Sequence, residues 1–374
     1  MKAMSLLIKP VSGNCNMRCR YCFYTDVSEM REVKSYGMMS LHTLETIVSK
    51  ALAEVTEYCA FGFQGGEPTL AGLDFYRILM ELEKKYNVNK VKTSHSIQTN
   101  GLLIDDEWAA FLADNHFLTG LSIDAGKQVH DGLRLDTQGK GTHTRCIHTA
   151  RALRKYRAEF NILSVVTKQL ALHPDQAYRF YKQNGFRYIQ FIPCLDGFDQ
   201  PSGSNPYSLP PELYGKFLCR VFDLWYQNFI EGDYCSIRAF DNYIHILAGY
   251  PPENCAMGGV CQPYPLIEAD GSVYPCDFYA VDEYYLGSVH TQSFGDLLTG
   301  TEAIRFIQPS RQLHSSCTAC RHHTICRGGC RRDREPAVGG QMGLNRFCEA
   351  YLTFFDHAID RMREISYRMF PRSN

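Results

Sequence analysis

The strongest constraint on the fold of this chain is a regular alternation of two sequence patterns over its first 200 residues. Short runs rich in apolar and β-branched residues predict buried strands at 4–9, 59–64, 93–99, 117–123, 160–167 and 188–193. Segments with apolar residues at helical spacing lie between them, at 40–57, 73–86, 105–115, 142–157 and 173–184. Because repeated strand–helix units form parallel sheets with crossover helices, the pattern predicts an α/β barrel, open or closed, or a doubly wound sheet. In each of these folds ligands bind at the carboxyl ends of the strands.

The second half of the chain is organised differently. A stretch rich in Pro, Ser and Gly at 200–211 marks a loop, and a long amphipathic helix is predicted at 212–230. Beyond residue 251, cysteines, glycines and turn residues replace the alternation until a final helix at 346–369. We therefore expect an α/β region over 1–200, a loop and bridging helix over 201–250, and a small cysteine-rich region with a C-terminal helix over 251–374.

Charge and hydropathy exclude several classes of partner. The formal net charge is -1, which gives no electrostatic hold on nucleic acid or on an anionic membrane. No stretch approaches the roughly 18 apolar residues that span a membrane. The first apolar run ends at Pro10, too early for the core of a signal peptide. We expect a cytoplasmic protein that binds neither nucleic acid nor membrane.

Three of the 16 cysteines crowd into the loop after the first predicted strand, as Cys15, Cys19 and Cys22. In a chain of this size with no expected signal sequence, metal binding explains such clustering better than disulfides do. Three thiolates at this spacing can hold one cubane iron–sulfur cluster and leave its fourth iron free for a small molecule. The alternative is a zinc site completed by a distant residue.

Eight further cysteines lie between Cys255 and Cys348, counting both ends, which is enough for two complete sets of four ligands. Two structural zinc sites and two iron–sulfur clusters both fit this number. The N-terminal triplet favours the clusters. The remaining cysteines are scattered singly and are expected to be small buried apolar residues: Cys59, Cys146, Cys194, Cys219 and Cys235.

The C-x3-C-x2-C spacing of the triplet, with Tyr21 before the last cysteine, resembles the signature of the radical S-adenosylmethionine (SAM) enzymes. The resemblance implies a partial (β/α)6 barrel and a [4Fe-4S] cluster whose open iron binds the amino and carboxylate groups of SAM. Motifs of that family also follow the second, third and fourth predicted strands, as "GGEP", "QTNG" and "SID". Arg134 resembles a cofactor-contacting arginine of closer relatives, and a surface arginine is its alternative. The implied cofactor contacts are Tyr21, Gln64, Gly65, Gly66, Glu67, Asn100, Ser122, Asp124, Arg134 and Leu195.

The C-terminal cysteines resemble those of the SPASM domain, which carries two auxiliary [4Fe-4S] clusters in radical enzymes that modify peptides and proteins. The match includes a Gly271-x4-Cys276 step and a C-x2-C-x5-C-x3-C run from Cys317 to Cys330. The interleaved pattern of that family implies a first cluster held by Cys255, Cys261, Cys276 and Cys330, and a second held by Cys317, Cys320, Cys326 and Cys348. Clusters that are ligated fully by protein suit electron transfer.

The whole chain is similar to the anaerobic sulfatase-maturating enzymes, through stretches such as "CNMRCRYCFY", "FGFQGGEPTLAG" and "DGSVYPCDFY". This family oxidises a cysteine or serine of a sulfatase, within a Cys/Ser-x-Pro-x-Arg motif, to Cα-formylglycine. The resemblance implies a 5′-deoxyadenosyl radical that removes a Cβ hydrogen, an auxiliary cluster that accepts the second electron, and a base for the proton of the target thiol or hydroxyl. Asp277, after Cys276, matches the proposed base, and Tyr24 is expected to assist it. The implied partners are an unfolded or nascent sulfatase polypeptide and a flavodoxin- or ferredoxin-type reductant.

Two loops depart from the pattern of that family. Ala125-Gly126 replaces the usual Gly-Pro after "SID", and the loop 196–210 is rich in Pro, Ser and Gly. These departures keep open a related function, the formation of a thioether, an epimer or another crosslink on a different peptide. An alternative from a different functional class is a binding protein stabilised by zinc. In that case Asp277 would be a solvated turn residue.

Overall fold

The computed structural model describes residues 1–198, 200–335 and 342–371 of the chain. Within these residues the central feature is a ten-stranded sheet with the order β10-β9-β8-β1-β2-β3-β4-β5-β6-β7. The strands that begin the chain are β1 (Ala3–Ile8), β2 (Tyr58–Phe63), β3 (Lys92–Thr99), β4 (Phe117–Ser122), β5 (Phe160–Val166) and β6 (Tyr188–Pro193). They lie in chain order and each pairs in parallel with the next, whereas the order reverses in a doubly wound sheet. The predicted partial (β/α)6 barrel is therefore confirmed, and every strand ends within one residue of its predicted limits.

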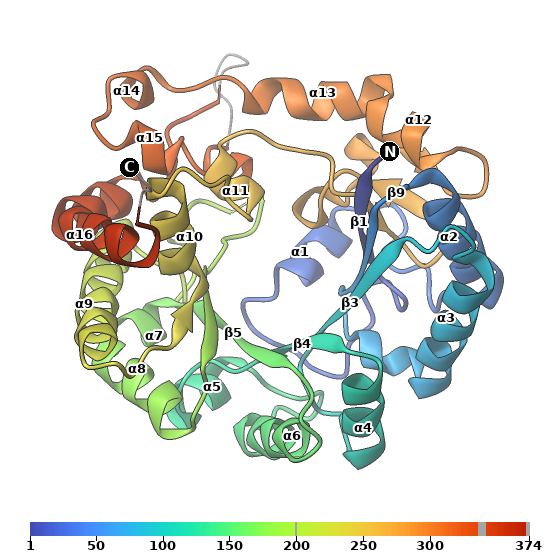
Figure 1. Cartoon of the computed structure of the whole chain (residues 1–374), viewed down its shortest axis with the longest axis horizontal. Coiled ribbons are helices and arrows are strands. Elements are labelled where there is room, and N and C mark those ends of the chain that lie inside the picture. Colours follow the sequence, from blue (N-terminus) through green and yellow to red (C-terminus); the bar gives the residue numbers. More distant parts are fainter. Residues whose placement is uncertain (199, 336–341, 372–374) are drawn as a thin grey trace.

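Helices cover the outer face of these strands (Figure 1). The crossover helices are α2 (Leu41–Glu54), α3 (Leu73–Tyr86), α4 (Asp106–Asp114), α6 (His143–Lys155) and α8 (Pro174–Gln183). In α2 the N-cap Ser40 accepts a hydrogen bond from the Thr43 amide at 3.0 Å, which fixes where the helix starts. Its apolar stripe, which includes Leu44 and Ile47, is fully buried. Burying each such side chain contributes about 1.5–3 kcal/mol to the free energy of folding.

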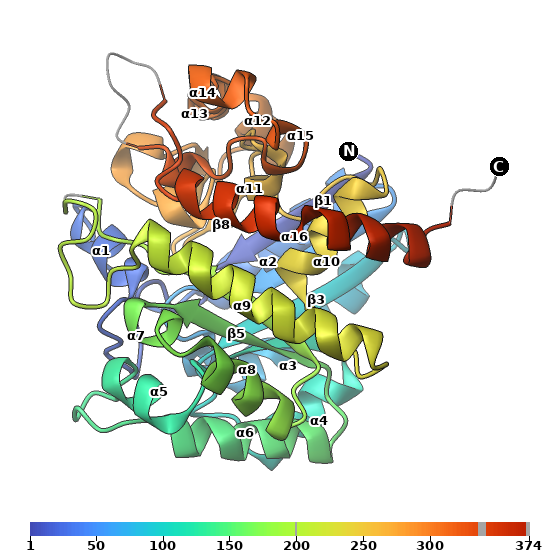
Figure 2. The ribbon, with the colours of Figure 1, turned by 90° about the vertical axis from the view of Figure 1, so that its left-hand side faces the viewer.

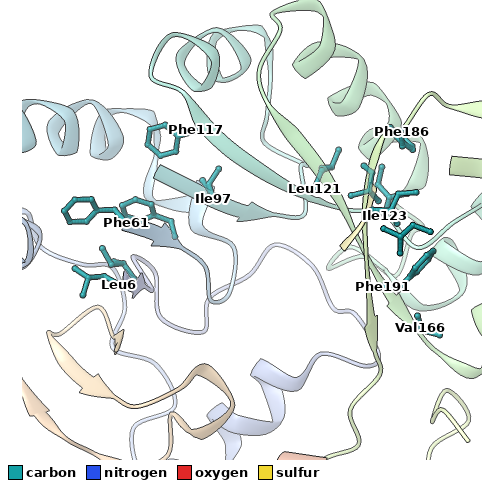
Figure 3. Close-up of a cluster of buried hydrophobic side chains, with 14 of the residues drawn as sticks. Leu6, Phe61, Ile97, Phe117, Leu121, Ile123, Val166, Phe186 and Phe191 are labelled. Atoms are coloured by element: carbon teal, nitrogen blue, oxygen red, sulfur yellow. The ribbon is translucent and has the colours of Figure 1, made fainter. Parts of the chain in front are cut away.

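The space between the strands and the helices forms the hydrophobic core of the barrel. Figure 3 shows Phe61 of β2, Ile97 of β3 and Phe117 of β4, which come from neighbouring strands and point into this layer. Aromatic rings on the helices meet those on the strands edge to face, as Phe63 of β2 and Tyr76 of α3 do with ring centroids 5.1 Å apart. Because this core holds the strands rigidly, the loops at their carboxyl ends have a fixed base. Three of these loops carry the short helices α1 (Phe23–Glu29), α5 (Lys127–Leu133) and α7 (Lys168–Ala171).

Three longer helices complete the side of the molecule shown in Figure 2: α9 (Pro211–Ile230), α10 (Arg238–Leu247) and α16 (Cys348–Met369). α16 lies along α9, and their axes approach closely where Gly215 faces Ala350, because a Cβ at Gly215 would lie 3.1 Å from the Ala350 Cα. The predicted helices over 212–230 and 346–369 are confirmed. The sequence prediction missed α10 and the short strand β7 (Ser236–Ile237) that precedes it.

The cysteine-rich region continues the sheet of the barrel. Its strands are β8 (Leu266–Ile267), β9 (Ser272–Tyr274) and β10 (Gly287–Ser288), and β8 pairs in parallel with β1. A buried ion cluster supports this junction, since Glu268 accepts from Lys9 of the barrel and from Arg31, each at 2.5 Å. The region is therefore fixed to the barrel edge by a hydrogen-bonded ladder and by charge.

The remaining elements of the cysteine-rich region are short. They are α11 (Cys255–Gly258), α12 (Phe294–Thr299), α13 (Thr301–Ser310), α14 (Ser315–Thr318), α15 (His323–Cys326), and the 3-10 helices η2 (Asp277–Tyr279), η3 (Asp282–Tyr284) and η4 (Arg331–Asp333), while η1 (Pro68–Ala71) belongs to the barrel. The helices α12 and α13 stand where only turns were predicted. Residue 199 of the loop 196–210, and 336–341 and 372–374 of the predicted C-terminal region, lie outside the described residues. Among the helices that are described, none is both long and apolar enough to cross a membrane.

Candidate active site

The cysteine triplet lies in the loop between β1 and α1, at the carboxyl end of the sheet. The loop is held by the end of α5 and the residues that follow it, because the Arg18 amide donates to the Leu135 carbonyl at 2.7 Å and the Arg20 amide to the Leu133 carbonyl at 2.9 Å. Burial raises the pKa of the Cys15 thiol to about 12 and that of Cys19 to about 11. The negative charge of Cys22 raises both further, and the three cysteines lie within one eight-residue stretch of this loop. Thiols in this state release protons when iron binds them, and the group fits a cubane cluster.

The two glycines after β2 let the chain pass under this loop. A Cβ at Gly66 would lie 2.0 Å from the Asn14 carbonyl oxygen, which is closer than any side chain can approach. The Gly66 amide donates to the Ser12 carbonyl at 3.0 Å, and the next amide donates to the Asn14 carbonyl at 2.8 Å. Gly65 has φ +113°, a conformation that glycine alone adopts freely, and packs against the Lys9 side chain. The "GGEP" stretch therefore supports the cysteine loop directly.

Glu67 braces the same region from inside the protein. Its carboxylate accepts from the Thr69 amide at 3.1 Å, from the Thr69 and Thr99 hydroxyls at 2.6 and 2.7 Å, and from the Asn100 amide at 2.7 Å. Burial raises the pKa of Glu67, and these four donors oppose that rise. Asn100 in turn donates to the Asn16 side chain at 2.8 Å and lies 3.8 Å from the Cys15 sulfur. With both of its oxygens engaged by protein, Glu67 fixes Asn100, and Asn100 contacts the cysteine loop.

A second buried network lies beside the triplet. Tyr21 donates to Asp124, and Arg134 donates to the Tyr21 hydroxyl oxygen at 2.9 Å. Asp124 also accepts from the Val165 amide at 2.9 Å, which connects the ends of β4 and β5. Arg134 is buried, with 7% of its surface exposed, so the surface alternative for this residue is excluded. Of the other predicted contacts, Ser122 accepts from Gln98 at 3.2 Å, and Leu195 is half-buried just after β6.

Asp277 lies together with residues from the loops that follow β1 and β2. Its carboxylate accepts from Gln64 at 2.9 Å and from the Tyr24 hydroxyl at 3.3 Å, and Gln64 also contacts Tyr24. The rings of Phe23 and Phe278 pack edge to face at 5.1 Å and hold the two segments together. Burial raises the pKa of Asp277, which makes its carboxylate a stronger base than an exposed aspartate. The alternative of a solvated turn residue does not fit, because the half-buried carboxyl group has three protein partners, Gln64, Tyr24 and Cys276.

The eight C-terminal cysteines form two electrostatic groups. Burial raises the pKa of Cys276 and of Cys330, and the charges of neighbouring thiols raise each pKa further. These neighbours all belong to one set of four, namely Cys255, Cys261, Cys276 and Cys330. Burial likewise raises the pKa of Cys326 to about 11, and the neighbouring charges that raise it further belong to Cys348, Cys317 and Cys320. The two groups coincide with the two sets implied by the SPASM resemblance. Among the described residues, no three His, Cys, Asp or Glu side chains are gathered as ligands of a single metal ion.

The ion cluster of Lys9, Arg31 and Glu268 lies near Asp277 and was not predicted from the sequence. The Lys9 ammonium is 5.4 Å from the centre of the Tyr24 ring, and its charge lowers the pKa of Asp277 against the effect of burial. The sequence did contain a sign of this cluster, because Lys9 and Glu268 carry opposite charges and each directly follows a short apolar run. Charged residues at such positions are rarely buried unless they pair.

Comparisons with known proteins agree with this site. The family model described as the radical SAM superfamily matches residues 10–176, and that of the SPASM iron-sulfur cluster-binding domain matches 261–321. The chain is 45% identical to a cysteine-type anaerobic sulfatase-maturating enzyme of Clostridium novyi (strain NT), over 98% of both chains. It is 43% identical to the enzyme of the same name from Clostridium perfringens (strain 13 / Type A), over 98% of this chain and 99% of that one. A serine-type anaerobic sulfatase-maturating enzyme of Bacteroides thetaiotaomicron is 30% identical, over 96% of this chain and 91% of its own.

A solved structure shares the complete fold. It is described as native anSMEcpe with bound AdoMet and Kp18Cys peptide, and it superposes with a TM-score of 0.94 at 42% sequence identity. The match covers 98% of this chain and 99% of that chain. The barrel, the cysteine-rich region and the C-terminal helix are therefore all part of the shared fold.

Proposed function

The chain belongs to the anaerobic sulfatase-maturating enzymes, and on that premise we propose that it oxidises a cysteine of a sulfatase polypeptide to Cα-formylglycine. As a radical SAM enzyme with a SPASM domain, it uses SAM and [4Fe-4S] clusters. The preference for cysteine is supported by 45% and 43% identity to cysteine-type relatives, against 30% to a serine-type relative. The observation that carries the proposal is the half-buried contact of Asp277 with Tyr24 and Gln64 beside the cysteine loop.

We assign the cofactors to the cysteine groups described above. Cys15, Cys19 and Cys22 would hold the cluster that binds SAM, and the network of Tyr21, Asp124 and Arg134 would line the SAM pocket. The two C-terminal sets of four would hold the auxiliary clusters. When bound, these groups supply a 5′-deoxyadenosyl radical that removes a Cβ hydrogen of the target, and an acceptor for the second electron. The support is the spacing of the cysteines, the matches to the radical SAM and SPASM family models, and the buried polar residues around the triplet.

The protein's own part in the reaction is to handle a proton. The target cysteine must lose its thiol proton while a Cβ hydrogen leaves, and Asp277 is the half-buried carboxylate that we propose takes it. Gln64 and Tyr24 orient that carboxylate by donating to the same oxygen, Oδ2, while Oδ1 accepts from the Cys276 thiol at 3.5 Å. Loss of the hydrogen atom, the proton and one electron gives a thioaldehyde. Water then replaces its sulfur, and sulfide leaves with formation of the aldehyde.

A peptide assay tests this function. Reconstituted enzyme is incubated anaerobically with SAM, a reductant and a peptide carrying Cys-x-Pro-x-Arg, and we expect sulfur to be replaced by oxygen with loss of two hydrogens. Formation of a thioether or an epimer instead would overturn the proposal in favour of another peptide modification. A matched peptide with serine at the target position should react more slowly, and a faster serine reaction would refute the cysteine preference.

The role of Asp277 is tested by Asp277→Asn. We expect SAM cleavage to persist while formylglycine formation falls by roughly 10²–10⁴-fold, the usual worth of a general base. The matched control is Glu283→Gln, an exposed carboxylate of the same region, which should leave both reactions unchanged. Unchanged product formation in Asp277→Asn would remove Asp277 from the mechanism.

The finer identity of the partners is also a proposal. We propose that the substrate is an unfolded or nascent sulfatase, because a folded one would bury the target motif, and that the reaction takes place in the cytoplasm. The free state of all 16 cysteines suits a reducing compartment. We propose a flavodoxin- or ferredoxin-type reductant. Arg18 and Arg20 are exposed on either side of Cys19, so an acidic electron carrier would meet positive charge there.

A further inference from the structure

Arg334 is a buried cation that binds backbone carbonyls rather than a carboxylate. Only 2% of its surface is exposed, and its guanidinium donates to the carbonyls of Gln312 and Ser310, each at 3.1 Å, and of Gly259 at 3.2 Å. Its Nε has no hydrogen-bond partner among the described residues. Nor does any described carboxylate form an ion pair with it, since the neighbouring carboxylates bind other arginines. Asp333 lies 3.7 Å from Arg346 and Glu335 accepts from Arg331 at 2.9 Å.

The guanidinium lies between the two sets of C-terminal cysteines. On one side its carbonyl partner Gly259 comes two residues before Cys261, and Ser310, its other partner, accepts from the Cys261 amide at 2.9 Å. On the other side its Nη1 is 4.0 Å from where a Cβ of Gly328 would lie, in the turn between Cys326 and Cys330. The segments that supply these contacts lie together above the barrel in Figure 1.

The guanidinium of Arg334 therefore contacts the segment before Cys261 of the first set and approaches the turn between Cys326 of the second set and Cys330 of the first. Arg331, which follows Cys330, is paired with Glu335 at 2.9 Å and packs over three aromatic rings. Arg334, by contrast, is a buried positive charge beside segments of both sets, with no ion-pair partner among the residues that the structure describes.

We propose that Arg334 is a shared positioning charge that raises the reduction potentials of both auxiliary clusters. A cubane bound by four thiolates is negatively charged, and reduction adds one more negative charge. A fixed cation in a buried site stabilises the reduced state more than the oxidised state, so each cluster accepts an electron more readily. The inference rests on the proposed function, because it requires both cysteine sets to hold clusters.

The test is a redox titration followed by electron paramagnetic resonance. It uses the full chain with Cys15, Cys19 and Cys22 replaced by alanine, so that only the auxiliary clusters contribute a signal. In Arg334→Gln we expect both midpoint potentials to fall, by about 59 mV, which is a tenfold change in the ratio of oxidised to reduced cluster. Arg334→Lys keeps the charge and should keep both potentials close to their original values, although it loses the planar fork. A purely structural role for the guanidinium would make the two variants alike.

The matched control is Arg321→Gln. Arg321 is next to Cys320, but its side chain is 67% exposed and paired with Asp356, so removing its charge should leave both potentials unchanged. Unchanged potentials in Arg334→Gln at normal iron content would overturn the proposal, as would a shift confined to one cluster. If Arg334→Gln does not retain iron, Leu313→Glu replaces it, since Leu313 also contacts the Gly328 position and would place a negative charge beside Arg334. Leu313→Glu should lower both potentials relative to Leu313→Gln, and equal potentials would overturn the proposal.

Failure of this inference is distinguishable from failure of the proposed function. Formylglycine formation on the cysteine peptide by the unaltered chain reports on the function alone. A charge-dependent potential without formylglycine would overturn the function and keep the role of Arg334.

Discussion

The buried ion cluster of Lys9, Arg31 and Glu268 leads to a quantitative prediction. Glu268 is fully buried and is the carboxylate that both cations contact, each at 2.5 Å, so replacing it by glutamine leaves two buried positive charges without a counter-charge. Removing one partner of a buried ion pair costs about 3–5 kcal/mol. The Glu268 Oε2, Arg31 Nε and Arg31 Nη2 atoms have no partner among the described residues, so the pair is not fully satisfied even before substitution. We therefore expect a loss near the lower end of that range, about 3 kcal/mol.

The assay is equilibrium urea unfolding of the reduced protein, with Glu268→Gln compared to Glu57→Gln. Glu57 pairs with Lys2 at 3.3 Å, but the side chains are 61% and 84% exposed, and such pairs contribute little. The control should therefore unfold like the unaltered chain. Adding Lys9→Met to Glu268→Gln should recover part of the loss, because one of the two stranded cations is removed. Equal stability of Glu268→Gln and Glu57→Gln would refute the reasoning.

The same cluster gives a pH dependence. Burial opposes ionisation of Glu268, but the charges of Lys9 and Arg31 outweigh it and hold the pKa of Glu268 below its ordinary value. A carboxylate with a depressed pKa in the folded state contributes stability that is present above its unfolded pKa of about 4.3. That contribution is lost as the pH falls through the lower, folded pKa. The stability difference between the unaltered chain and Glu268→Gln should therefore be constant near neutral pH and shrink in acid below pH ~4.

Two further predictions concern iron content after anaerobic reconstitution. The unaltered chain should hold about twelve irons, the sum of three cubanes, and replacing Cys15, Cys19 and Cys22 by alanine should leave about eight; a total near four in the unaltered chain would exclude the auxiliary clusters. Gly66→Ala should also lose the first cluster, because its Cβ would lie 2.0 Å from the Asn14 carbonyl, whereas Gly126→Ala, with nothing within 4 Å, should retain all of the iron; equal iron content in the two variants would contradict the role given to Gly66.

The barrel was predictable from sequence because each of its elements carries its own local signal. Most of the strands are short runs rich in apolar or β-branched residues, and α2 has both a serine N-cap and a buried stripe. The elements that sequence reasoning missed lack such signals or depend on distant partners. The helices α12 and α13 are short and follow turn-like residues in a stretch where cysteines dominate the pattern.

The site was predictable in parts but not as an assembly. The cysteines, Asp277 and Tyr24 were identified individually, and Gln64 was expected near the cofactor. The structure brings Gln64 and Asp277 together although 213 residues separate them, and no local pattern encodes such a contact. Lys9 and Glu268 are 259 residues apart and meet only because β8 pairs with β1. The role of Glu67 as a brace for Asn100 likewise depends on a contact between the loops after β2 and β3.

The pairing of β8 with β1 also has a consequence for synthesis on the ribosome. β1 is made first, yet its outer edge stays unpaired until β8 emerges, after the whole barrel has been translated. An open strand edge is a template for pairing with other chains, and long-range pairing is slow to form. The nascent barrel therefore passes through a period in which its first strand is exposed to aggregation. The end of that period coincides with the arrival of the segment that carries Asp277, so the edge is closed and the proton acceptor is delivered in the same late folding step.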